Sequence, residues 1–82
     1  MFNYVYLCIL PMDNSDVHKK LGRRIKKFRE QAHLSQQELG KITKLHRTHI
    51  GAVERGQQNI SVDSVYKIAK SLKVKLKDLF DF

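Results

Sequence analysis

Residues 34–56, LSQQELGKITKLHRTHIGAVERG, contain the pattern that decides the fold of this chain. Ser35 is followed three residues later by Glu38, which is the pattern of a capping box. In such a box each side chain bonds to the other residue's backbone N–H, so a helix begins directly after the serine. We therefore predict a short helix over residues 36–43.

A second short helix is predicted over residues 47–55. Ile50 and Val53 are its inward-facing positions, and Gly56 ends it because glycine readily adopts the left-handed conformation found after a helix C-terminus. Leu45 closes the tight turn between the two helices. The stretch as a whole therefore predicts two short helices joined by a tight turn.

Apolar residues at helical spacing predict three further helices around this pair. Before it, Ser15 or Asp16 in a polar segment is expected to cap a helix. One face of that helix is apolar and is formed by Val17, Leu21, Ile25, Phe28 and Ala32. After it, a helix that follows Ser61 carries on one face Val62, Val65, Ile68, Ala69 and Leu72. A last helical turn covers residues 76–80. The predicted fold class is all-α, a compact five-helix domain over residues 15–82.

The first twelve residues, MFNYVYLCILPM, are apolar and stand apart from the predicted domain. They are fewer than the roughly 20 residues of a membrane-spanning helix, and they lack the basic start and cleavage site of a signal peptide. Three interpretations stay open for the tail over residues 1–14. It is a mis-assigned start with Met12 as the true initiator, a β-strand that pairs with another chain, or a hydrophobic segment packed on the domain.

The composition indicates one small, strongly basic domain. The 82 residues include 16 Lys and Arg against 8 Asp and Glu, for a formal net charge of +8. This charge favours an anionic partner such as nucleic acid or a membrane surface. Cys8 is the single cysteine, so no internal disulfide is expected and the chain suits a reducing cytoplasm. No metal-ligand spacing, catalytic constellation or cofactor motif is found, so neither an enzyme nor a cofactor is predicted.

Residues 21–80 resemble the helix-turn-helix domain of phage repressors and Cro proteins. The matching stretches are LSQQEL at 34–39, RTHI at 47–50, VERG at 53–56, IAKSL at 68–72 and LF at 79–80. Within that family, RTHI, the ERG at 54–56 and the NIS at 59–61 are similar to controller proteins of restriction–modification systems. This resemblance implies a homodimer that binds a palindromic operator and regulates transcription.

The turn departs from the family pattern at two positions. The family usually has glycine where this chain has Lys44, and a lysine with a positive φ costs roughly 1–2 kcal/mol. Either the turn differs slightly, or the cost is borne and Lys44 gains a phosphate contact. Gly40 stands where the family usually has alanine, at the close crossing of the two short helices, and a glycine inside a helix costs about 1 kcal/mol.

In this motif the second of the two short helices lies in the major groove, and its N-terminal residues reach the base edges. The predicted base contacts are therefore Arg47, Thr48, His49 and Ala52. Arg47 is suited to guanine because its guanidinium donates to O6 and N7 together. A contact from Arg47 to phosphate alone is the alternative, and His49 either reads a base or touches a phosphate.

The predicted phosphate contacts surround this helix. The start of the first short helix, at Gln36, presents free N–H groups to an anion. The full predicted set is Gln36, Lys44, Arg55, Gln57, Gln58, Asn59 and Ser61. Ordinary solvation of a polar loop is the alternative for residues 57–61.

Two further sets of residues are predicted to hold the structure together. The resemblance implies a buried ion pair between Arg29 and Glu54. The C-terminal apolar residues exceed what so small a core needs, so some of them are predicted to form a dimer interface, and the alternative is that all are core. The set is Tyr66, Leu72, Val74, Leu76, Leu79, Phe80 and Phe82.

The sequence therefore predicts a DNA-binding regulator whose partners are double-stranded DNA and a second copy of the chain. A helix-turn-helix module that binds a protein, as an antitoxin or anti-regulator component does, is the alternative. A membrane-surface protein anchored by residues 1–10 is a weaker one, since no basic amphipathic helix adjoins that segment. No small-molecule effector is expected, because no second domain is seen.

Overall fold

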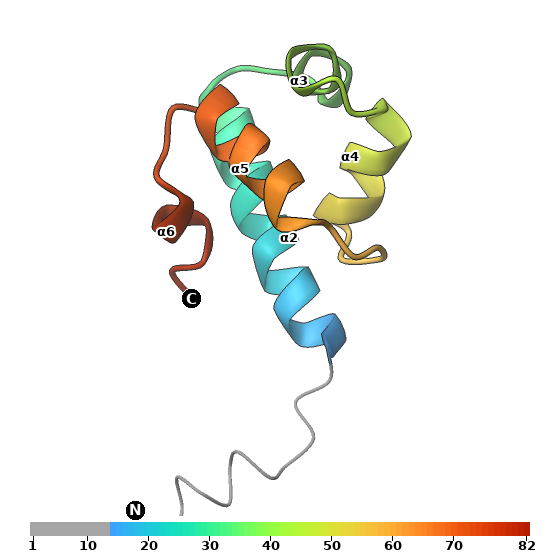
Figure 1. Ribbon diagram of the computed structural model, residues 1–82, viewed down its shortest axis with the longest axis vertical. Coiled ribbons are helices and arrows are strands. Elements are labelled where there is room, and N and C mark those ends of the chain that lie inside the picture. The colour runs from blue at the N-terminus through green and yellow to red at the C-terminus, as the bar shows by residue number, and fades with distance from the viewer. Residues whose placement is uncertain (1–13) are drawn as a thin grey trace, which may run out of the picture.

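The computed structural model describes residues 14–82, which form five helices and no strand (Figure 1). The helices are α2 (Asn14–Gln31), α3 (Gln36–Thr43), α4 (Arg47–Glu54), α5 (Val62–Ser71) and α6 (Leu76–Leu79). The predicted all-α, five-helix class is confirmed. The alternatives for the N-terminal tail lie outside the described residues, and the first helix already begins at Asn14. Ser15 and Asp16 are therefore in its first turn, not before it as predicted.

The long helix α2 passes through the middle of the molecule, and α5 crosses it (Figure 1). The pair α3–α4 lies on one side of these two helices and α6 lies on the other. One apolar core joins all five, and it is formed by Leu21, Ile25, Leu39, Ile50, Val53, Val65, Ile68, Ala69, Leu72 and Leu79. Burial of these side chains on facing helices provides the main driving force for folding.

The start of α3 has the predicted capping box. The Glu38 backbone N–H donates to Ser35 Oγ at 3.0 Å, and the Ser35 N–H donates to Glu38 Oε1 at 2.8 Å. The Glu38 carboxylate has a pKa below its ordinary value, chiefly because the Ser35 backbone N–H donates to it. Two N–H groups that a helix start leaves without partners are thereby bonded, so α3 begins at a defined residue.

The tight turn after α3 has a lysine in the left-handed conformation. Lys44 has φ 62° and ψ 25°, the left-handed conformation, and its N–H donates to the carbonyl of Gly40. Leu45 N–H donates to the same carbonyl at 3.0 Å. The sequence left two outcomes open for this turn. The structure shows that Lys44 keeps the left-handed conformation and that the fold tolerates its steric cost.

Two glycines allow backbones to approach closely around α4. A Cβ atom on Gly40 would lie 2.6 Å from the Leu45 carbonyl oxygen, which is too close for any side chain. A Cβ on Gly22 of α2 would overlap the carbonyl oxygens of Val53 and Glu54. Glycine at these positions therefore lets the chain fold back after α3 and lets the end of α4 rest on α2.

The helix α5 corrects one prediction about the core. Val62 was expected on its inward face, but its side chain is 74% exposed. Ser61 is the N-cap of α5 and accepts the Ser64 N–H at 3.1 Å. Val62 is thus the first helical residue and lies on the outward side of the first turn, whereas Val65 and Ile68 are buried.

Candidate nucleic-acid interface

The N-terminal end of α4 presents polar side chains to solvent. Arg47 and Thr48 are exposed and His49 is half-buried. Ala52, one turn further, is only 7% exposed, so its contact with a base would be limited to a small part of its methyl group. The Arg47 and Thr48 side chains are thus accessible within one folded chain, as a reading surface requires.

His46 caps this helix through its imidazole ring. Its Nδ1 accepts the Thr48 backbone N–H at 3.1 Å and lies 2.6 Å from Thr48 Oγ1. The Thr48 hydroxyl is thereby held against the helix start as a donor to the same nitrogen, so its methyl group and the two lone pairs of its oxygen have a defined orientation. Sequence reasoning did not identify this cap because histidine is not among the usual N-cap residues.

His49 is joined to the loop that follows α4. Its Nδ1 lies 2.8 Å from Oε1 of Gln58, nine residues further along the chain. The loop returns to the helix because the Gly56 N–H donates to Val53 O and the Gln57 N–H donates to Ala52 O. This contact unites one predicted base-contact residue with one predicted phosphate-contact residue.

A buried ion pair connects α2 with the end of α4. Arg29 Nε donates to Glu54 Oε2 at 2.6 Å, and Arg29 Nη2 donates to Glu54 Oε1 at 3.1 Å. Both residues are buried, and hydrogen bonding to Glu54 raises the pKa of Arg29 above its ordinary value. Arg29 Nη1 also donates to the Leu34 carbonyl at 2.7 Å. This is the pairing that the resemblance implies, and it leaves Arg29 no surface for DNA.

Gln36 takes part in the same network. Its Nε2 donates to Glu54 Oε1 at 2.9 Å. The side chain therefore links the start of α3 to the end of α4 with one N–H of its amide. The second N–H of that amide and the backbone N–H groups of the first turn of α3 are the groups of this segment that could meet an anion.

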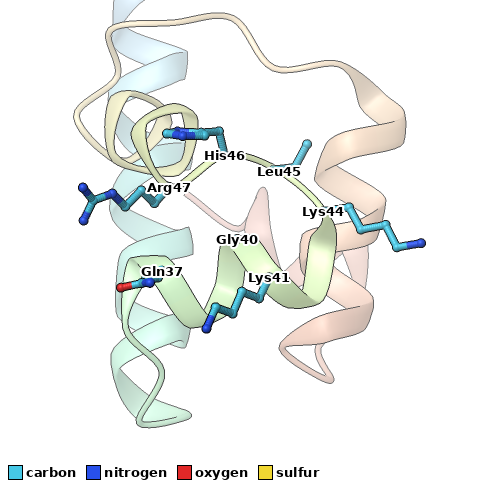
Figure 2. A pocket seen from close by; sticks show the side chains of 7 residues that line it. All are labelled: Gln37, Gly40, Lys41, Lys44, Leu45, His46 and Arg47. Carbon is cyan, nitrogen blue, oxygen red and sulfur yellow. The ribbon is translucent and has the colours of Figure 1, made fainter.

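A hollow of about 500 Å³ lies between α3 and α4 and has a basic lining (Figure 2). Figure 2 shows Gln37 and Arg47 extending to the same side, whereas Lys44 extends to the opposite side. Gln37 and Lys41 were not predicted as site residues. Their spacing of four residues on α3 places them on one helix face, and that spacing could have identified them.

The loop after α4 contributes a second polar surface. Arg55 is exposed, and its Nε donates to Gln57 Oε1 at 2.9 Å. Gln58 and Asn59 are also exposed. The Ser61 hydroxyl caps α5 and donates to Ser64 Oγ at 3.0 Å, so its main contacts are within the chain.

The predicted dimer-interface residues fall into three groups. Leu72 and Leu79 are 6% and 0% exposed and belong to the core of the single chain, so they offer no surface to a second copy. Val74 and Leu76 are half-buried and pack against that core. Three aromatic residues remain exposed, and these are Tyr66 at 54%, Phe80 at 45% and Phe82 at 53%.

Within residues 14–82, every helix is too short or too polar to span a lipid bilayer.

Comparison with known proteins places this geometry in context. The model of the helix-turn-helix family matches residues 25–79. Control protein C.BamHI of Bacillus amyloliquefaciens is 38% identical over 69 residues, which cover 83% of this chain and 85% of that protein. Control protein C.SmaI of Serratia marcescens is 34% identical over 64 residues, which cover 78% and 76% of the two chains. The crystal structure of the restriction–modification controller protein C.AhdI from Aeromonas hydrophila matches with a TM-score of 0.80 and 35% identity, over 83% of this chain and 99% of that one.

Proposed function

Because this chain belongs to the helix-turn-helix family, we propose that it is a sequence-specific regulator of transcription that binds double-stranded DNA as a homodimer. The observation that carries the proposal is the exposed N-terminal end of α4, where Arg47 and Thr48 extend from a capped helix. A helix of this width fits the major groove, and side chains at its N-terminus reach base edges.

The regulated genes are those of a restriction–modification system. This part of the proposal is supported by the relatives, which are control proteins of such systems and whose length this chain covers for the most part. The predicted likeness to that group is thereby confirmed. A regulator of this kind acts where the DNA is, so we place the protein in the cytoplasm.

The residue roles follow the exposure of the side chains. Arg47, Thr48 and His49 contact bases, and Ala52 contributes at most a methyl contact. Phosphates on either side of the groove are held by side chains and by the first-turn N–H groups of α3. The phosphate-binding side chains are Gln37, Lys41, Lys44, Arg55, Gln57, Gln58 and Asn59.

A dimer reads two half-sites together, so its discrimination between DNA sequences is the square of that achieved by one recognition helix. The surface that we assign to it contains the exposed side chains Tyr66, Phe80 and Phe82 with the half-buried Val74 and Leu76. Exposed aromatic residues are typical of interface cores, and the Phe80 and Phe82 rings lie 6.3 Å apart between centroids. An operator read by such a dimer is palindromic, because two-fold symmetry in the protein requires it in the site.

Selection of bound sites from random double-stranded DNA tests this function directly. We expect a palindrome to emerge, and we expect its affinity to fall roughly a thousandfold between about 50 and 200 mM salt as counterions are released. If no sequence is enriched at either salt concentration, the proposal is wrong and a protein-binding module becomes the better explanation.

Two variants separate base reading from backbone binding in the same assay. Arg47→Ala should relax the preferred base at one position of each half-site, at a cost of about 1–3 kcal/mol on the best site. Lys44→Ala should weaken binding to all sequences about equally and reduce the salt slope by about one. Equal behaviour of the two variants would contradict the assigned roles.

A further inference from the structure

The hydrogen-bond partners of the two histidines at the start of α4 indicate protons on different ring nitrogens. His46 Nδ1 accepts the Thr48 backbone N–H, so in the neutral ring the proton of His46 is on Nε2. His49 Nδ1 instead faces Oε1 of Gln58 at 2.8 Å. With the Gln58 amide oriented so that Oε1 faces the ring, this oxygen can only accept, which assigns the proton of neutral His49 to Nδ1 as the donor to Gln58.

The consequence for His49 concerns its other nitrogen. With Nδ1 protonated, Nε2 of the neutral ring has a lone pair and no proton. His49, Gln58 and Thr48 line the same open hollow of about 610 Å³ beside α4. The edge of the ring that is not bonded to Gln58 is therefore a hydrogen-bond acceptor in the proposed reading surface.

We propose that Gln58 is a positioning residue that makes His49 select a base with an exocyclic amino group, which is adenine or cytosine. In the major groove, adenine presents N6–H₂ and cytosine presents N4–H₂ as donors, whereas guanine presents only the acceptors N7 and O6. An imidazole acceptor can bond to the amino group of adenine or cytosine, but it is repelled by the acceptors of guanine. The inference rests on the proposed function and adds to it a rule for one base position.

This selectivity complements that of Arg47. The guanidinium has five donors and no acceptor, so it suits guanine. His49, with an acceptor at Nε2, suits the opposite pattern. Two neighbouring residues of one short helix thus present opposite hydrogen-bonding character to the groove, and a half-site that satisfies both contains guanine at one position and adenine or cytosine at another.

The backbone of the loop makes the Gln58 contact specific to that residue. Hydrogen bonds from the Gly56 and Gln57 N–H groups to α4 hold the loop against the helix. The Gln57 side chain binds Arg55 and not His49. Gln57 is therefore a matched control, since it has the same side chain, the same loop and the same exposure but no contact with the ring.

The tautomer can be measured in the free protein without DNA. Long-range ¹H–¹⁵N spectra of the neutral imidazole signals should show His49 with its proton on Nδ1. The Gln58→Leu variant should lose this preference, with an unchanged melting temperature, and the Gln57→Leu variant should keep it. A wild-type His49 protonated on Nε2, or exchanging between the two forms, would overturn the inference.

Site selection tests the rule for the base. His49→Ala identifies the operator position that this residue reads, because preference there is lost. At that position the wild-type protein should favour adenine or cytosine about five- to tenfold over guanine. Gln58→Leu should reduce the ratio several-fold, whereas Gln57→Leu should weaken all sites and leave the ratio unchanged.

The two proposals fail in different ways. Guanine at the His49 position, or an unchanged ratio in Gln58→Leu, overturns the inference while the DNA-binding function stands. The absence of any selected DNA overturns the function, and the spectra of the free protein still decide which nitrogen of His49 carries the proton.

Discussion

Lys44 has a backbone conformation that its side chain disfavours, and the side chain extends from the turn into solvent (Figure 2). Glycine would remove the strain but would also lose more conformational entropy on folding. We expect Lys44→Gly to raise the free energy of unfolding by about 0.5–1 kcal/mol in urea titrations. The same variant should bind all DNA sequences more weakly.

Lys41→Gly is the control for this prediction. Lys41 lies inside α3, where glycine costs about 1 kcal/mol relative to a good helix former. The two lysine-to-glycine changes should therefore alter stability in opposite directions. A loss of stability in Lys44→Gly would mean that the lysine side chain stabilises the turn by more than its backbone strain costs.

Glu54 is the acceptor on which Arg29 and Gln36 converge. Glu54→Gln leaves the Arg29 charge buried without an opposite charge, and this should lower the free energy of unfolding by about 3–5 kcal/mol. Thermal melts compared with the exposed Glu30→Gln variant, which should change stability by less than about 0.5 kcal/mol, check the value. Similar melting temperatures for the two variants would show that the pair contributes little.

At the scale of the helix, the capping box makes the stability of α3 dependent on pH. Because the folded pKa of Glu38 is lowered, its contribution is present at neutral pH and is lost as pH falls through that lowered value. Glu38→Gln keeps an acceptor but does not titrate. The stability difference between wild type and variant should therefore narrow between about pH 7 and pH 3, as measured by urea unfolding.

If the difference between wild type and Glu38→Gln stayed constant over this range, the hydrogen bond from Ser35 would not depend on the carboxylate charge. Ser35→Ala provides an independent measure of the same box, with an expected loss of about 1 kcal/mol at neutral pH.

The helices could be predicted closely, because capping, periodicity and glycine all act locally in the sequence. The limits of α3 were predicted to the residue, and α4 ends one residue earlier than expected. The bond of Gln36 to Glu54 and the bond between His49 and Gln58 could not be predicted, since each depends on how segments meet in space. Val62 was wrongly placed in the core, and Leu72 and Leu79 follow the core alternative and not the interface, because periodicity does not give the depth of burial.

At the scale of the molecule, the exposed aromatic residues near α6 determine whether the protein is a monomer or a dimer. We expect the wild-type protein to sediment as a dimer at tens of micromolar, and Phe80→Glu to shift it toward monomer by placing a charge in an apolar contact. Ile42→Glu alters a comparably exposed side chain on α3 and should leave the dimer intact. A wild-type monomer at this concentration would contradict the assigned surface.

The network of Arg29, Glu54 and Gln36 has a consequence for the operator itself. It connects α2, α3 and α4 into one rigid unit, so the proposed recognition helix α4 has little freedom to move when a DNA site departs from the optimal geometry. If the distance between the two recognition helices of the dimer differs from the distance between the half-sites, the DNA duplex must bend to fit. Operators with identical half-sites should therefore differ in affinity with the elasticity of the untouched centre, and flexible TA or CA steps there should bind more tightly than a rigid A-tract.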